Sequence, residues 1–193
     1  MNDEQFISLL RAKQQQLQHL FQRKLPIMVG AMAKRHFQEN FRQGGFVNNG
    51  LQKWTPAKRT LQGGSSAADN YGTLLSGRNH LFSSIGYKPE SGSVTIGTSV
   101  PYAGLHNFGG ATHPTVTAKM RGFAWAMYYK NGGGVKGQEP PQAAQRWKAL
   151  ALTRKQKLNI KIPKRQFIGD SRELNIDIGA KIQSEIALVL SSS

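Results

Sequence analysis

The stretch DEQFISLLRAKQQQLQHLFQRKLPIMVGAMAKRHFQENFR, residues 3–42, predicts the longest element of the fold. Its apolar side chains recur at three- and four-residue steps, which places them along one face of a helix: Phe6, Leu9, Leu10, Leu17, Leu20, Phe21, Leu25, Met28 and Met32. Asn2, with Gln5 three residues later, is typical of a helix N-cap. Because Pro26 lacks a backbone N–H, we expect a kink there or two helices end to end. Gly44 ends the helix.

This helix, over residues 1–43, is too long to bury its apolar stripe against a short body alone. We therefore expect it to form an arm that extends along the domain or packs on a neighbouring subunit.

Between Gly44 and Thr73 the composition is typical of a loop, and Trp54 is its one large apolar group. We expect Trp54 to anchor this loop to the core. A short helix should follow over Thr73–Phe82, with its leucines directed inward.

An antiparallel hairpin comes next, with strands over Ser84–Tyr87 and Ser93–Thr98 and a turn at residues 89–92. Residues 101–110, PYAGLHNFGG, indicate a short helix or tight loop packed on this sheet. The glycine pair that closes this stretch permits positive φ.

Residues 111–161 have the character of an insertion, and its basic hairpin should have arms over Ala149–Thr153 and Leu158–Ile162. A closing helix from about Arg172 to Leu190, capped by Asp170 or Ser171, should pack on the sheet. The chain thus predicts one α+β domain over residues 1–193: a long N-terminal helix, a small antiparallel sheet with an inserted basic hairpin, and a C-terminal helix.

Composition argues against an enzyme. The chain has 193 residues and no Cys, which excludes disulfides and thiol nucleophiles. Between Glu39 and Glu139 the only acids are Asp69 and Glu90, so paired carboxylates for acid–base chemistry are lacking. We predict no catalytic residues, no cofactor and no metal site, and regard a hydrolase acting on polyanions as unsupported.

The five histidines show no metal-binding spacing. His106 and His113 flank a glycine pair and could face each other. A hydrogen-bonded structural role is favoured, because no Asp, Glu or Cys lies nearby in the sequence to complete a ligand shell.

The charge is strongly basic, with 26 Lys and Arg against 10 Asp and Glu and a formal net charge of +16. This excess of positive charge either increases solubility or indicates that the protein functions next to a polyanion or an acidic partner. Basic and aromatic residues interleave in the insertion, which allows contact with DNA; the cations that could face DNA are Lys119, Arg121, Arg154, Lys155 and Lys157. Alternatively, the aromatics are core residues and the cations are their solvated flanks.

No apolar run is long enough to span a bilayer. The N-terminus begins with acidic residues, Asp3 and Glu4, and no apolar signal core follows. We expect a soluble protein made for the cytoplasm, without a membrane partner.

Four stretches, in order, resemble the phage virion morphogenesis family of Mu-like phages and prophages. They are GLQKW (50–54), LLSGRNHLFSSI (74–85), VTIGT (94–98) running into YAGLHNFGG (102–110), and IPKRQFIG (162–169). The insertion at 111–161 departs from the family pattern, because such proteins need a much shorter connection there.

The motif positions are candidates for contacts with partner proteins: Trp54, Leu75, Gly77, Tyr102, His106, Phe108, Gly109, Pro163, Arg165 and Phe167. Leu75 and Gly77 could start the short helix. Tyr102, His106 and Phe108 would lie against the sheet. Arg165 could lie flat on an aromatic ring or bridge to a carbonyl, and so fix the turn into the final helix.

The resemblance implies a structural, non-enzymatic virion assembly protein that acts in tail completion or head–tail joining (the neck). It implies a homo-oligomer, with a ring as the expected form, and other phage head–tail or tail proteins as partners. The protein would be found in the host cytoplasm during assembly and then in the virion. A neck channel passes DNA, so non-specific DNA contact is a further expectation; a basic nucleic-acid-binding protein is the alternative reading.

Overall fold

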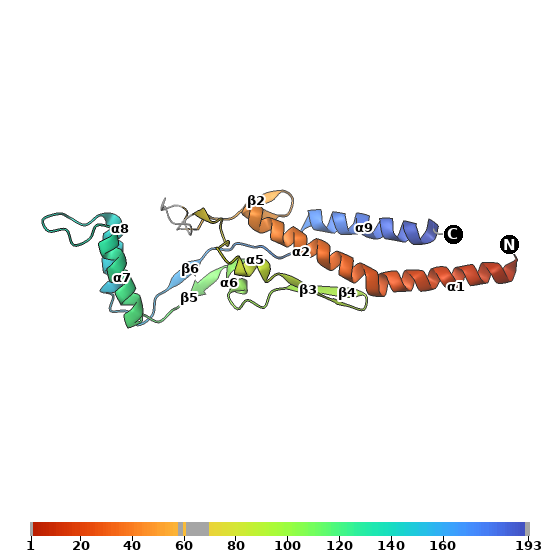
Figure 1. Cartoon of the computed structure of the whole chain (residues 1–193), viewed down its shortest axis with the longest axis horizontal. Coiled ribbons are helices and arrows are strands. Elements are labelled where there is room, and N and C mark those ends of the chain that lie inside the picture. Colours follow the sequence, from red (N-terminus) through yellow and green to blue (C-terminus); the bar gives the residue numbers. More distant parts are fainter. Residues whose placement is uncertain (1, 58–59, 61–69, 192–193) are drawn as a thin grey trace. The chain divides into compact units, whose positions relative to one another are not determined.

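The computed structural model describes residues 2–57, 60 and 70–191 (Figure 1). The chain forms two compact units. The main unit comprises the described residues of Met1–Gly109 and Pro163–Ser193, and the inserted unit is Gly110–Ile162. The insertion expected at 111–161 lies within the inserted unit.

The N-terminal arm consists of helix α1 (Asp3–His19), a π-helix (Leu20–Lys24) and helix α2 (Leu25–Gln43). The Gln5 N–H donates to the Asn2 side chain at 2.9 Å, and the Asn2 N–H donates back to the Gln5 side chain at 3.1 Å. This reciprocal pair confirms the predicted N-cap. Pro26 lies in the first turn of α2, but the chain is already helical through the π-helix, so its missing N–H removes one donor from a continuous helical run. The prediction of two helices end to end is correct in that α1 and α2 are separate elements, and the π-helix joins them.

Two antiparallel hairpins belong to the main unit. Strands β3 (Gly86–Glu90) and β4 (Ser93–Gly97) pair with Gly86 opposite Gly97, which confirms the predicted hairpin with its first strand shifted along the chain. Strands β1 (Gly45–Val47) and β2 (Leu51–Lys53) form a second hairpin within the stretch expected to be a loop.

The turn of this second hairpin is the signal that the loop interpretation overlooked. Asn49 and Gly50 take positive φ values of 53° and 94° there. An Asn-Gly pair between short apolar runs favours such a turn. Residues 58–59 and 61–69 of the expected loop lie outside the described residues.

The short helix expected over Thr73–Phe82 is limited to α5 (His80–Ser83), so most of that prediction is wrong. Leu74 and Asn79 have positive φ values of 64° and 45°, which a right-handed helix cannot contain. The helix expected within 101–110 is present as α6 (Ala103–Phe108), and Gly109 follows it with φ 75°.

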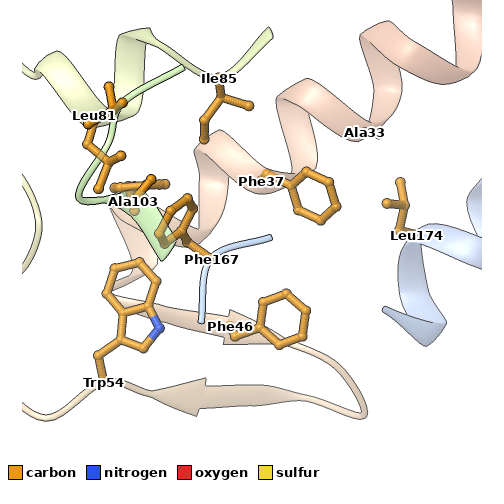
Figure 2. Close-up of a cluster of buried hydrophobic side chains, with 11 residues drawn as sticks. Ala33, Phe37, Phe46, Trp54, Leu81, Ile85, Ala103, Phe167 and Leu174 are labelled. Atoms are coloured by element: carbon orange, nitrogen blue, oxygen red, sulfur yellow. The ribbon is translucent and has the colours of Figure 1, made fainter. Parts of the chain in front are cut away.

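The core of the main unit is built on the inner face of α2 (Figure 2). Phe41 is 1% exposed and packs its ring against Trp54 and Phe167, with centroids 5.5 and 5.1 Å apart. The other members are Ala33, Phe37, Phe46, Leu81, Ile85, Val100, Ala103 and Leu174. Trp54 therefore anchors its segment to the core, as predicted.

The C-terminal helix α9 (Arg172–Ser191) packs against α2 and α1, not on the sheet as expected. The β3–β4 hairpin packs on α2 so closely that a Cβ at Gly30 would meet the Tyr87 ring. Helix α2, and not the sheet, is therefore the element on which α9 packs. The β3–β4 hairpin and α9 both pack against α2. The Ser171 hydroxyl accepts from the Leu174 N–H at 3.3 Å, which identifies Ser171 as the cap.

Polar contacts tie α9 to the arm. Lys24 lies 2.7 Å from Glu185, and the Lys13 ammonium donates to the Val189 carbonyl at 2.7 Å. Lys181 and Lys24 both donate to the Glu185 carboxylate, which lowers the pKa of Glu185. In the part of the chain that the structure describes, no helix is sufficiently long and apolar to cross a membrane.

In the inserted unit, strand β5 (Gly110–Thr112) pairs antiparallel with β6 (Ile160–Ile162), and helices α7 (Ala118–Lys130) and α8 (Gln142–Ala151) lie between them in the sequence. The predicted basic hairpin is therefore wrong in its first arm, since Ala149–Thr153 begins as the end of α8. The alanine-rich run of α8 favours a helix, and it buries Ala144 and Ala151 at helical spacing. The small sheet expected for the fold is three separate two-stranded ladders.

Candidate functional site

The predicted motif segments converge on Pro163–Gly169, a stretch without helix or strand that carries Phe167 into the core. Asn107, in α6, holds its backbone: the Phe167 and Ile168 N–H groups donate to the Asn107 Oδ1 at 2.8 and 3.0 Å. The Asn107 amide donates in turn to the Ile168 carbonyl at 3.1 Å. Asn40, in α2, donates to the Phe167 carbonyl at 3.2 Å and accepts from the Val47 N–H at 3.1 Å.

Arg165 fixes the same stretch to the segment after β2. Its Nε donates to the Thr55 carbonyl at 2.9 Å and its Nη2 to the Pro56 carbonyl at 3.3 Å. Its backbone N–H donates to the His106 carbonyl at 2.8 Å. Of the two roles expected for Arg165, the bridge to a carbonyl is therefore confirmed.

Trp54 contributes both its ring and its indole N–H. The ring is buried against Phe41, and Nε1 donates to the Gln166 carbonyl at 2.7 Å. The irregular stretch around Phe167 thus has its backbone groups satisfied by side chains from three other segments, as buried irregular backbone requires.

A pocket of about 220 Å³ lies beside Arg165, and its lining includes Leu75, Leu81, Tyr102 and His106. Four of the motif candidates therefore lie together around this pocket, although the first and the last are about ninety residues apart in the sequence: Leu75, Tyr102, His106 and Arg165. The Tyr102 hydroxyl lies 3.3 Å from the His80 Nδ1, and its ring meets the His106 ring edge-on with centroids 5.9 Å apart.

His106 is electrostatically unusual. Its Nδ1 is buried and has no hydrogen-bond partner among the described residues. Burial lowers the pKa of His106, and the adjacent Arg165 guanidinium lowers it further. The imidazole is therefore held neutral at neutral pH.

The other motif candidates lie outside this cluster. Phe108 is 75% exposed, so the expectation that it lies against the sheet is wrong: α6 buries Ala103 and Asn107, and Phe108 directly follows the buried Asn107. Tyr102 packs on His80 and His106 instead of the sheet. Pro163 is exposed.

Two glycines among the candidates have different surroundings. At Gly109, φ is 75° and a Cβ would lie 2.9 Å from the Lys164 backbone nitrogen, so only glycine fits this close approach. Gly77 is exposed in a turn near the Tyr71 hydroxyl. The expected role of Leu75 and Gly77 in starting a helix is wrong, because the helix begins at His80.

The candidate DNA-facing cations all belong to the inserted unit. Lys119 and Arg121 are on α7, and Arg154, Lys155 and Lys157 follow α8. All are exposed except Arg121, which is half-buried.

Asn40 and Asn107 are the functional residues that sequence reasoning missed. Asn40 lies between Phe37 and Phe41 on the buried face of α2, where an amide flanked by phenylalanines at helical spacing was the available signal. Asn107 lies within a quoted motif, but its role requires knowledge of which segment returns beside it.

The site fixes the path of the chain, because the side chains of Asn40, Asn107 and Arg165 are hydrogen-bonded to backbone groups. Among the described residues, no three His, Asp or Glu side chains are grouped so that they could hold a metal ion. His106 and His113 belong to different units.

Residues 9–187 match the model of the phage virion morphogenesis family. Neither a curated protein nor a solved structure matches the chain.

Proposed function

Because the chain belongs to the phage virion morphogenesis family, with a role in phage virion assembly, we propose that it acts in tail completion or head–tail joining. It does so as a homo-oligomer, for which a ring is the expected form, and its partners are other head–tail or tail proteins. It works through its surfaces and not as a catalyst.

The apolar face of α1 carries this proposal. None of the residues in α1 is buried, although Phe6 and Leu10 lie one helical turn apart with exposed fractions of 47% and 53%. Ile7 and Leu9 extend the same exposed apolar surface. Contiguous exposed apolar surface on a helix is typical of a protein–protein contact.

Charge favours a second copy of this chain as the occupant of that face. Asp3 and Glu4 balance Arg11 and Lys13, so α1 is neutral within a chain of net charge +16. Two copies would repel each other through most of their surface, but not through α1.

The mass of the full chain in solution tests the proposal. We expect multiples of 21.3 kDa for the natural protein, and the monomer for a Phe6→Glu, Leu10→Glu double variant. The matched control is Ala12→Glu with Gln15→Glu, which adds the same charge on other faces of α1 and should leave the mass unchanged. A natural protein that stays monomeric at every concentration contradicts self-association through this helix.

Complementation in a phage that lacks the gene tests the assembly step. Without the protein we expect separate heads and tails, or unfinished tails, in electron micrographs of the lysate. Supplying the natural protein or the control variant should restore particles, and the double variant should not. Lysates with normal particles in the absence of the protein would contradict the role.

A further inference from the structure

The net positive charge of the chain is concentrated in the inserted unit. Residues 110–162 contain ten Lys and Arg residues and a single carboxylate, that of Glu139. The remaining residues contain sixteen Lys and Arg against nine Asp and Glu. More than half of the net charge of +16 therefore lies in about a quarter of the chain.

This charge is not neutralised within the unit. All residues of Gly110–Ile162 are described, and none of its ten cations takes part in an ion pair; the four ion pairs of the described chain belong to the main unit. Nine of the ten side chains are exposed: Lys119, Lys130, Lys136, Arg146, Lys148, Arg154, Lys155, Lys157 and Lys161. Such a surface attracts a polyanion.

The local pairing gathers part of this charge at the start of α7. Thr115 bridges Lys157 in antiparallel register, and the Val116 N–H donates to the Gln156 carbonyl at 2.8 Å. Thr117 follows directly and caps α7, because its side chain accepts from the Met120 N–H at 3.2 Å. Lys119, in the first turn of α7, and Lys157 thus flank the segment that leads into the positive end of the α7 dipole, and Arg154 and Lys155 shortly precede Lys157 in the sequence.

The aromatic side chains of the unit are engaged with one another. The Phe123 and Trp147 rings join α7 to α8 edge-on, with centroids 5.7 Å apart. The Trp125 ring stacks on Tyr129 at 6.2 Å and meets Tyr128 edge-on at 5.5 Å. Each of these rings thus packs on a neighbour and helps to build the unit. Phe123 and Tyr129 are nevertheless 57% and 62% exposed, so contact with bases is a separate outcome that the test must distinguish from contact with phosphates.

We propose that the inserted unit binds the phosphate backbone of duplex DNA through its exposed cations, without reading the base sequence. The inference goes beyond the assembly role and does not depend on it. Duplex DNA is favoured over an acidic protein because it carries one negative charge per about 1.7 Å. An extended acidic polypeptide carries at most one charge per roughly 3.4 Å.

Fluorescence anisotropy of the full-length protein with a labelled short duplex of arbitrary sequence tests the proposal. We expect binding that is independent of sequence and that weakens steeply between about 50 and 200 mM salt. A Lys119→Gln, Arg154→Gln, Lys155→Gln variant should bind about tenfold more weakly or worse at low salt. The slope of log K against log salt should become shallower by up to about 3.

The matched control is Arg35→Gln with Lys53→Gln and Arg78→Gln, which removes the same charge from exposed positions of the main unit. It should retain the affinity and slope of the natural protein. An equal loss in this variant overturns the proposal, because binding would then follow net charge and not the inserted unit.

Three other results overturn it. Absence of binding at low salt removes DNA as the partner. Polyglutamate that displaces the duplex as well as unlabelled duplex does, at equal charge concentration, assigns the surface to an acidic protein. Tighter binding to single-stranded DNA, lost in a Phe123→Ala or Tyr129→Ala variant, assigns it to base stacking.

Discussion

The Asn107 side chain uses both ends of its amide on the segment that carries Phe167 into the core. Its oxygen accepts from two successive N–H groups and its nitrogen donates to the Ile168 carbonyl. A single side chain thus satisfies three backbone groups that neither helix nor strand would satisfy.

Replacing Asn107 should therefore be costly. We expect Asn107→Ala to lower the free energy of unfolding by about 2–4 kcal/mol, because two N–H groups lose their acceptor beside the core. Asn175→Ala is the control, since its amide donates to Asp170 at an exposed site; it should cost less than about 1 kcal/mol. Urea unfolding of both variants measures the difference, and similar losses would contradict this role for Asn107.

His106 should make the stability depend on pH. Its pKa is lowered in the folded chain by burial and by Arg165, so the unfolded state binds the proton more readily. The free energy of unfolding should fall as the pH decreases below the ordinary value of 6.5. A His106→Gln variant should show a shallower decline between about pH 7 and 5, measured by urea unfolding.

The carboxylate of Glu173 loses its contribution to stability at a lower pH than His106 and so does not affect this test. The pKa of Glu173 is lowered because the Gly50 N–H donates to it, so its contribution is lost below 4.5. If His106→Gln leaves the decline above that range unchanged, the imidazole is not its source.

At the residue scale, what could be predicted depended on size and spacing. Trp54 was expected in the core because a lone large apolar group in a loop has no better location. Arg165 was expected to bridge or stack, but its partners, the Thr55 and Pro56 carbonyls, come from a segment more than a hundred positions earlier. Such pairings require the tertiary path and leave no local signal.

The arm is the element in which sequence and structure agree most fully, because capping and periodicity are local properties. The Asn2 cap, the Pro26 break and the Gly44 end were each expected, and the structure shows each. The π-helix between α1 and α2 was not expected. Its Gln22 carbonyl accepts from the Gly92 N–H of the β3–β4 turn at 3.4 Å, a tertiary contact.

Replacing glycine by alanine at the C-cap of α2 and inside α9 should change the stability of the protein in opposite directions. Gly44 ends α2 with φ 66°, and a methyl group added there would have no atom within 4 Å, so Gly44→Ala should cost about 1 kcal/mol from backbone strain alone. Gly179 lies inside α9 with equally open space, and Gly179→Ala should add about 0.5–1 kcal/mol of stability. Thermal unfolding measures both, and shifts of the same sign would contradict the explanation.

The shorter elements were predicted less well because their boundaries depend on single backbone angles and on packing. The positive φ values of Leu74 and Asn79 make α5 shorter than predicted. The positive φ of Leu74 could not be predicted from its residue type, because leucine rarely adopts this conformation. The segment Ala149–Thr153 alternates small and large side chains, which suggested a strand. It is nevertheless helical at its start, because α8 packs against α7 and buries Ala144 and Ala151.

At the scale of the whole molecule, the chain leaves the main unit at Gly109 and returns at Pro163. Gly110 and Ile162 are paired across β5 and β6, so the two crossing points are adjacent. The sequence indicated where the insertion begins and ends, whereas its helical content came from packing between α7 and α8.

Removal of the inserted unit tests this division. Replacing residues 111–161 by Asn-Gly should leave a main unit that unfolds cooperatively, because the pair Gly110 and Ile162 can be closed by a two-residue turn. The shortened protein should keep the oligomeric mass of the natural one and lose DNA binding. Circular dichroism, solution mass and anisotropy measure these outcomes, and failure to fold would show that the two units depend on each other.

The central place of Phe167 has a consequence for synthesis on the ribosome. The residues that surround its ring, from α2 to α6, are translated before Gly109, and all of Gly110–Ile162 is translated before Phe167 itself. The core of the nascent N-terminal portion therefore lacks the Phe167 side chain while more than fifty further residues are added. Slow translation of Gly110–Ile162 would prolong the exposure of these apolar core residues to chaperones.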